Sequence, residues 1–296
     1  MKKLVFLLFA VASLLVTGSA FATVRVVSTI PDFADIAKSV GGDKVEVSSM
    51  VRPTQDPHFV DAKPSFVLDL NQADLLLVAG MELEAGWLPP LLAGARNAKI
   101  QRGAPGYLDC STLIPPMEVE APDRSQGDIH PGGNPHYWTD PRNGVRIARG
   151  IAKRLEQIDP ANAAAYEAGA QSFVTMLEGR MAEWQKILAP VKGRKVVVYH
   201  DSWIYFLDWA GFVQAGTLEP KPGIPPRADH VAQLIQQTQG QGVKYMIQES
   251  FYPTQLSNLF AQKAGAQLLV LPTMTGAGGT HSYVDVIDAI VRAVSK

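Results

Sequence analysis

Residues 159–190 read DPANAAAYEAGAQSFVTMLEGRMAEWQKILAP, and this stretch decides how the chain is organised. Its apolar residues recur at steps of three and four: Tyr166, Ala170, Phe173, Leu177, Met181, Trp184 and Leu188. That period predicts one continuous helix, which begins after Asp159-Pro160 and ends at Pro190. About 30 residues at 1.5 Å each span roughly 45 Å, longer than most helices within one domain. We therefore expect a helix that connects two lobes.

On the N-terminal side of this helix, apolar runs of strand length alternate with helical segments. Val24 to Ile30 predicts a buried strand, and Phe33 to Val40 predicts the helix after it. Val45 to Val51 and Leu75 to Ala79 repeat the strand pattern. Strands that alternate with helices at this spacing indicate a parallel sheet with helices on its faces.

The same alternation resumes after the long helix, where Lys195 to Tyr199, Val243 to Gln248 and Gln267 to Leu271 predict strands. We therefore predict an α/β fold of two lobes with parallel-type sheets, joined by one long rigid helix. The expected segments are a signal peptide (1–22), an N-terminal lobe (23–158), the linking helix (159–191) and a C-terminal lobe (192–296).

The first 22 residues have the pattern of a secretory signal peptide. Met1-Lys2-Lys3 is a basic start, Leu4 to Val16 is apolar, and Ala20-Phe21-Ala22 is a small-x-small cleavage site. The apolar run is too short for a convincing membrane span, and no cysteine stands near the cleavage site to carry a lipid. We therefore expect a soluble periplasmic protein that begins at Thr23.

The charge and the cysteine content argue against a nucleic-acid-binding protein and against a fold held by disulfides within the chain. Cleavage removes two of 27 basic residues and no acidic residue, which leaves a net charge of about −3 with neutral histidines. A balance so close to neutrality argues against a nucleic acid as the partner. Cys110 is the single cysteine of the sequence. No disulfide can form within the chain, so packed cores must stabilise it.

Three stretches far apart in the chain each present one histidine. They are Thr54-Gln55-Asp56-Pro57-His58, Asn134-Pro135-His136-Tyr137-Trp138 and Val198-Tyr199-His200-Asp201-Ser202. Ligands of parallel sheets bind beyond the carboxyl ends of strands, and His58 and His200 both follow a predicted strand. Three imidazoles and one oxygen form a reasonable tetrahedral zinc site. The spacings are not those of a compact motif, so spacing alone leaves the metal site as one hypothesis among others.

Taken in order, these stretches closely resemble the metal-binding solute receptors of ABC importers, the zinc/manganese cluster that includes the ZnuA and TroA types. The matching segments are Pro53 to His58, Asn134 to Pro141, Ile158 to Tyr166, Tyr199 to Trp203 and Val243 to Pro253. The resemblance covers nearly all of the chain after the expected signal peptide. It implies two pseudo-symmetric α/β lobes joined by a rigid helix, with the metal bound between them.

Carried over by position, the resemblance implies that His58 and His136 are metal ligands from the N-terminal lobe. His200 is then the third ligand and the first from the C-terminal lobe. Manganese-type relatives tend to have a carboxylate at this position, so the histidine favours Zn2+ over Mn2+. Imidazole nitrogen also favours late first-row metals over manganese.

The fourth ligand stays open at this point. Many relatives place an Asp after the last strand, but the stretch from Leu271 to His281 contains none. Glu249 is our first choice, because it is a carboxylate at the carboxyl end of a predicted strand. Its alternative role is to orient a ligand histidine. Asp56, His281 or a water molecule are the further candidates, and His130 is expected to have at most an auxiliary role.

The resulting prediction is a periplasmic, high-affinity zinc receptor that delivers its ion to an ABC importer permease in the inner membrane. We expect a monomer without enzymatic activity. One alternative is a manganese-specific receptor of the same family. Another is a zinc-dependent hydrolase with an open fourth coordination position and Glu249 as general base, although the sequence has no His-Glu-x-x-His motif.

Overall fold

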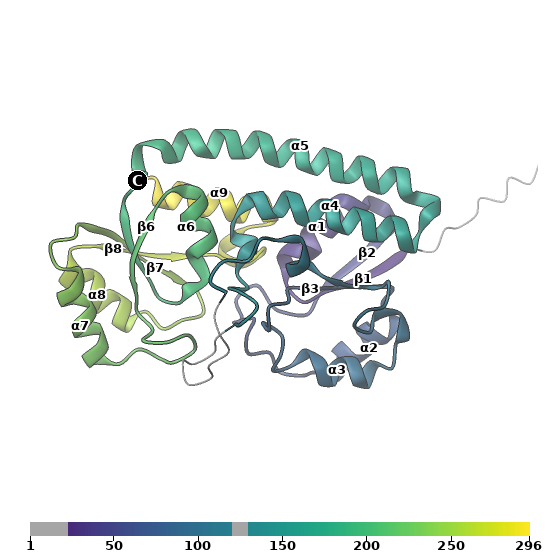
Figure 1. Cartoon of the computed structure of the whole chain (residues 1–296), viewed down its shortest axis with the longest axis horizontal. Coiled ribbons are helices and arrows are strands. Elements are labelled where there is room, and N and C mark those ends of the chain that lie inside the picture. The colour runs from purple at the N-terminus through teal and green to yellow at the C-terminus, as the bar shows by residue number, and fades with distance from the viewer. Residues whose placement is uncertain (1–22, 120–129) are drawn as a thin grey trace, which may run out of the picture.

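The computed structural model describes residues 23–119 and 130–296, so the expected signal peptide lies outside the described residues. The fold is α/β, with two parallel four-stranded sheets. Helix α5 (Ala163–Leu188) runs along one side of the molecule and links the two halves (Figure 1). The predicted fold class is therefore confirmed.

The first sheet has the strand order β2-β1-β3-β4, and all neighbouring strands are parallel. Its strands are β1 (Val24–Ser28), β2 (Val45–Ser49), β3 (Leu75–Val78) and β4 (Tyr107–Asp109). The helices between and after them are α1 (Pro31–Gly41), α2 (Pro64–Gln72), α3 (Leu88–Ala95) and α4 (Pro141–Ile158). All four residues of β3 are buried, which explains its unbroken apolar sequence.

The second sheet repeats this order as β6-β5-β7-β8, again with parallel neighbours. Its strands are β5 (Lys195–Val198), β6 (Val213–Thr217), β7 (Val243–Glu249) and β8 (Gln267–Leu271). The accompanying helices are α6 (Ile204–Ala210), α7 (Ala228–Thr238), α8 (Gln255–Ala264) and α9 (Tyr283–Val294). Elements α3, β4, α6 and β6 are not predicted by the sequence patterns.

Helix α5 packs against α4 from one half of the chain and against α9 from the other (Figure 1). Its 26 residues correspond to about 39 Å. The predicted apolar stripe faces these helices: Tyr166, Phe173, Leu177 and Trp184 are buried, whereas Met181 is only partly buried. One face of the helix therefore contributes to the core on both sides of the molecule.

The two halves also meet beside the sheets. The indole N–H of Trp138 donates to the carbonyl oxygen of Thr273 at 2.8 Å, and the hydroxyl of Tyr283 donates to the carbonyl oxygen of Trp138. The carboxylate of Asp32, at the start of α1, accepts hydrogen bonds from the backbone N–H and hydroxyl of Thr275. These contacts join segments more than 130 residues apart and fix how the strand ends of the two sheets face each other.

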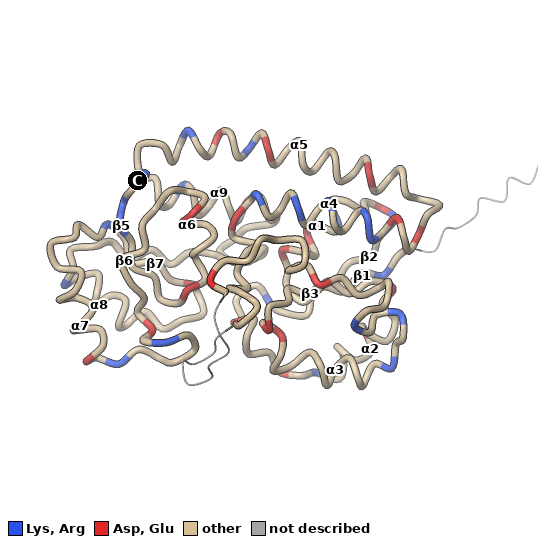
Figure 2. Tube along the Cα trace, viewed as in Figure 1, with Lys and Arg blue, Asp and Glu red and all other residues tan. Residues whose placement is uncertain are grey.

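Charged residues of both signs are spread over both halves of the molecule (Figure 2). Within residues 23–119 and 130–296, we find no helix with the length and apolar character that crossing a membrane requires. The lobe boundaries at residues 158 and 191 stay a prediction.

Candidate metal centre

The structure brings His58, His136 and His200 together between the two sheets. One ring nitrogen from each lies within 4.8 Å of the others. The ring centroids are 5.0 Å apart for His58 and His136, 5.3 Å for His58 and His200, and 5.1 Å for His136 and His200. Three histidines that are 78 and 64 residues apart in the sequence therefore lie next to one another in the structure.

His58 lies in the loop that follows β2, and a local turn holds its ring. The carboxylate oxygen Oδ1 of Asp56 accepts from the backbone N–H of His58 at 2.9 Å and is 2.8 Å from its Nδ1. An Asp that bonds a backbone N–H two residues later forms an Asx turn. The side chain of His58 is only 6% exposed, so the sequence Asp56-Pro57-His58 presents the ring inward.

His136 is held in the same way, with an amide in place of the carboxylate. The side-chain oxygen of Asn134 accepts from the backbone N–H of His136 at 3.0 Å and is 3.0 Å from its Nδ1. The amide nitrogen of Asn134 donates to the carbonyl oxygen of Asp201, which lies next to His200 in the chain. This loop therefore positions one histidine and contacts the segment that carries another.

His200 follows β5 and has a more distant partner. Its Nδ1 is 2.7 Å from Oε2 of Glu219, a residue that lies just beyond the carboxyl end of β6. Both side chains are 5% exposed. The same oxygen accepts a hydrogen bond from the backbone N–H of Gly223 at 3.1 Å. A buried carboxylate thus orients this ring from a different strand.

These three contacts determine which nitrogen of each ring is available. The partner of each Nδ1 is an oxygen acceptor, so Nδ1 carries the proton in the neutral imidazole. The lone pair is then on Nε2, and an outer oxygen that fixes this tautomer is typical of metal-binding histidines. The side chain of His58 leaves its Nε2 buried with no hydrogen-bond partner among the described residues.

The pKa values of these groups follow from burial and from their partners. Burial, together with the neighbouring histidines, holds the pKa of His136 well below 6.5. Burial also lowers the pKa of His200, but the hydrogen bond and charge of Glu219 more than offset it and raise that pKa above 6.5. For Asp56, burial raises the pKa, while the hydrogen bond and charge of His58 outweigh burial and lower it.

Glu249 is the last residue of β7, as expected of a carboxylate at a strand end. It is 1% exposed, and neither carboxylate oxygen has a hydrogen-bond partner of standard geometry within the described part of the chain. Burial raises its pKa to about 7, against the opposing influence of His200 and Ser202. It does not belong to the group of atoms within 4.8 Å of one another. The structure therefore places Glu249 near the histidines without bringing it into contact with all of them.

The other candidates for a fourth ligand lie in different places. Asp56 is engaged with Nδ1 of His58, on the side of the ring opposite Nε2. His281 is exposed on the segment before α9, and its backbone N–H donates to Asp285. The ring of His130 lies 5.4 Å from that of His58, centroid to centroid, so this histidine stands beside the cluster.

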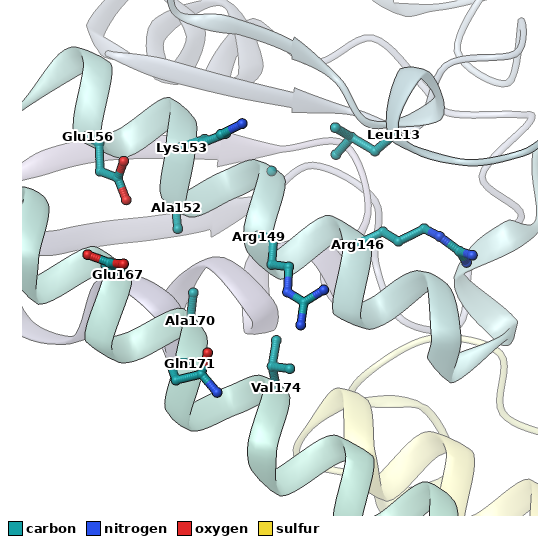
Figure 3. A pocket seen from close by; sticks show the side chains of 11 residues that line it. Leu113, Arg146, Arg149, Ala152, Lys153, Glu156, Glu167, Ala170, Gln171 and Val174 are labelled. Atoms are coloured by element: carbon teal, nitrogen blue, oxygen red, sulfur yellow. The ribbon is translucent and has the colours of Figure 1, made fainter.

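Of two cavities in the molecule, the smaller one adjoins the histidines. One of about 230 Å³ adjoins the cluster and is lined by His58, His200, Glu219 and Tyr252, among others. A larger cavity of about 610 Å³ lies between α4 and α5 (Figure 3), where Arg149 points toward the neighbouring helix. None of the three histidines lines this larger cavity, so cavity size does not identify the metal centre.

Sequence reasoning missed two of the residues that hold the histidines, Glu219 and Asn134. Asn134 stands in the quoted stretch, and its spacing of two residues from His136 matches that of Asp56 from His58. Glu219 follows a strand in the same sense as His200 and Glu249, so the strand-end rule would have found it if β6 had been recognised.

Comparisons with known proteins show which family the chain resembles. A family profile described as zinc-uptake complex component A, periplasmic (ZnuA), matches residues 26–296. The metal ABC transporter substrate-binding lipoprotein ScbA of Streptococcus cristatus is 31% identical over 62% of this chain and 56% of the relative. The iron-binding protein YfeA of Yersinia pestis is 25% identical over 92% of this chain and 85% of the relative. The chain spans about half the length of the first three curated relatives it matches, at 56%, 58% and 50%.

Solved structures share the fold. A crystal structure of ZnuA superposes with a TM-score of 0.78 at 27% identity, over 92% of this chain and 98% of that chain. A cadmium-bound periplasmic metal-binding protein from Candidatus Liberibacter asiaticus has a TM-score of 0.76 at 21% identity, over 92% of this chain and 100% of that chain. The second similarity concerns the fold alone.

Proposed function

The chain belongs to the ZnuA family of metal-binding receptors of ABC transporters, and from this premise we propose that it is a periplasmic receptor that binds Zn2+ as transported cargo. The observation that carries the proposal is the convergence of one ring nitrogen each from His58, His136 and His200 within 4.8 Å. Receptors of this family bind and release their cargo without chemical turnover, so no catalytic residue is assigned.

The choice of zinc rests on the ligand atoms. Names of relatives specify manganese, iron and zinc in different cases, so the metal must be inferred from this chain's own residues. Imidazole nitrogen binds zinc more strongly than manganese, which is better served by carboxylate and water oxygen. A site with three imidazoles therefore favours zinc, and a manganese-specific receptor is the second candidate.

We infer that the histidines move together slightly when the ion binds. Two nitrogens bound to one tetrahedral zinc at 2.0–2.1 Å lie about 3.4 Å apart. The separation of up to 4.8 Å in the structure thus requires shifts of roughly 1 Å. Rotation of side chains supplies such a shift without any change in the sheets.

Glu249 is our proposed fourth ligand. Its carboxylate is buried at the end of β7 without a hydrogen-bond partner of standard geometry among the described residues, an arrangement that is costly unless a cation compensates it. A bound zinc ion between the lobes would supply that compensation. A water molecule in the fourth position, with Glu249 as its hydrogen-bond acceptor, is the alternative.

The remaining parts of the proposal concern location and partner. The predicted signal peptide over residues 1–22 would export the chain to the periplasm. There we expect a monomer that delivers zinc to a permease in the inner membrane; the family implies only that the partner is an ABC transporter.

Metal titration of the purified protein tests the proposal. Competition with a chelator of known affinity should give tight binding of one zinc per chain and much weaker binding of manganese. His136→Ala should abolish tight binding, whereas the control His230→Ala should not, because the ring of His230 bonds the carbonyl oxygen of Thr217 outside the cluster. Preferential binding of manganese would establish the second candidate, and tight zinc binding by His136→Ala would contradict the site.

A further inference from the structure

The partner of His200 differs from the other two histidine partners in its place along the chain. Asp56 and Asn134 each stand two residues before the histidine they hold, whereas Glu219 stands 19 residues after His200. A local turn orients its histidine even when other parts of the lobe move. A contact between distant segments holds its histidine only while both segments stay in place.

One oxygen atom of Glu219 joins these two segments. Oε2 is 2.7 Å from Nδ1 of His200 and 3.1 Å from the backbone nitrogen of Gly223, both of which donate to it. The carboxylate and the imidazole are each about 95% buried. Hydrogen bonds shielded from water are electrostatically stronger than exposed ones. The ring of His200 and the loop around Gly223 are thus linked through a single acceptor.

The loop that contains Gly223 is stiff. Residues 219–226 read EPKPGIPP, and proline fixes φ at four of these eight positions. An antiparallel bridge joins Lys221 and Ile224 across a turn in which Gly223 has φ 71°, a conformation that glycine adopts without strain. A loop of this kind moves as a unit. A displacement at Glu219 therefore reaches the exposed side chain of Ile224.

The same loop borders the metal centre from the outside. Gly223 and Pro225 line the cavity of about 230 Å³ together with His58 and His200. Phe59, which follows His58 directly, lines this cavity too and is 64% exposed. The loop is therefore placed where its order affects access to the ion.

We propose that Glu219 is a positioning residue that aims Nε2 of His200 at the metal and couples metal binding to the order of loop 219–226. The proposal rests on the proposed function, because it takes His200 as a ligand. A bound ion fixes the imidazole, the fixed imidazole holds Glu219, and Glu219 holds the loop through Gly223. When the ion leaves, the imidazole of His200 is no longer fixed, so Glu219 and then the loop become less ordered.

Variants of Glu219 test this coupling. Glu219→Ala removes the acceptor, and Glu219→Gln keeps an oxygen of the same reach while it removes the charge. Asp229→Asn is the matched control, because it removes an exposed carboxylate at the start of α7, in the helix that follows this loop. For each protein we would measure zinc affinity by chelator competition, and amide hydrogen exchange over residues 219–226 with and without zinc. A ¹⁵N NMR spectrum of the histidine side chains would report the tautomer of His200.

In the wild type and in Asp229→Asn, zinc should slow amide exchange in the loop, and His200 should carry its proton on Nδ1. Glu219→Ala should bind zinc about 10–100-fold more weakly, lose the zinc-dependent protection and populate both tautomers. Glu219→Gln should fall between the two, and it serves in place of Glu219→Ala if that variant does not fold.

Zinc affinity within twofold of the wild type in the Glu219 variants, or unchanged protection of the loop, would overturn the inference. If His200→Ala loses zinc in the same experiment while the Glu219 variants behave as wild type, the inference fails and the proposed function stands. A wild-type protein that binds no zinc overturns both.

Discussion

The two sheets share one strand order, yet they hold their histidines by different means. Beside the first sheet, His58 and His136 are each oriented by an oxygen two residues earlier in the chain. Beside the second, His200 is oriented by Glu219, which lies just beyond the end of another strand, β6. The same tautomer is thus produced once by local turns and once by tertiary structure. The orientation of His200 therefore depends on the folding of its whole lobe, whereas the orientation of His58 and His136 depends mainly on local turns.

The largest expected effect follows removal of His200, the one histidine that the second half contributes to the cluster. His200→Ala leaves two imidazoles, and a ligand's share of the 10–16 kcal/mol typical of zinc sites is about 3 kcal/mol. We therefore expect zinc affinity to fall on the order of 100–1,000-fold. Chelator competition at pH 7.5 measures it. Affinity equal to that of the wild type would remove His200 from the site and with it the contrast between the two halves.

Acidification should act first on the second half. The pKa of His200 is raised by Glu219, whereas that of His136 is lowered by burial. Protons therefore compete with zinc for His200 already above pH 6.5, and for His136 only at much lower pH. Zinc affinity should fall at least about tenfold between pH 7.5 and pH 5, with proton release on binding. Equal affinities at the two pH values would count against imidazole ligation.

The local support of His136 should tolerate a change that keeps its geometry. Asn134→Ala removes the oxygen that fixes Nδ1, so zinc affinity should fall about 10–100-fold. Asn134→Asp keeps the acceptor for Nδ1 but loses the amide donor to the carbonyl oxygen of Asp201, so it should recover part of that loss. Titration of both variants checks this. If Asn134→Ala binds zinc normally, the turn is not what holds this histidine.

The smallest expected effect concerns a contact between the two halves away from the metal. Burial raises the pKa of Asp32 to about 7 from its usual 3.8, against its hydrogen bonds from Thr275. The native state then retains a proton that the unfolded state has lost, so Asp32 makes the free energy of unfolding fall as pH rises from about 4 to 7. Above about pH 7 Asp32 is ionised in both states, so its contribution to the free energy of unfolding no longer changes with pH.

Asp32→Asn abolishes this titration while it keeps an oxygen for Thr275. Relative to the wild type, the variant should gain stability on going from pH 5 to pH 8, by on the order of 1–3 kcal/mol. Urea unfolding of both proteins at the two pH values measures the difference in their free energies of unfolding. The contributions of all other titrating groups are the same in both proteins and cancel in this difference. A difference independent of pH would show that Asp32 is ionised in the native protein throughout.

The long helix and the strand-helix alternation could be predicted because their signals are local. The stripe of apolar residues from Tyr166 to Leu188 has one period over its whole length, and β3 is an unbroken apolar run. Strand β6 gave no such signal. It lies at the edge of its sheet, its five residues are partly or fully exposed, and a glycine interrupts it.

Glu219 was missed for the same reason, since a residue at the end of an unrecognised strand cannot be placed near a site. The neighbourhood of His58, His136 and His200 came from the resemblance to metal receptors, because separations of 78 and 64 residues carry no geometric information by themselves. Glu249 was found from the strand-end rule, and the structure places it in that position. Its coordination to the metal stays a prediction.

The most direct test is anomalous scattering at the zinc edge from crystals of the zinc-loaded protein. The account predicts one strong peak per chain, about 2.0–2.1 Å from a ring nitrogen of His58, of His136 and of His200 alike. A peak that only two of these rings contact, or one located elsewhere in the molecule, would contradict it.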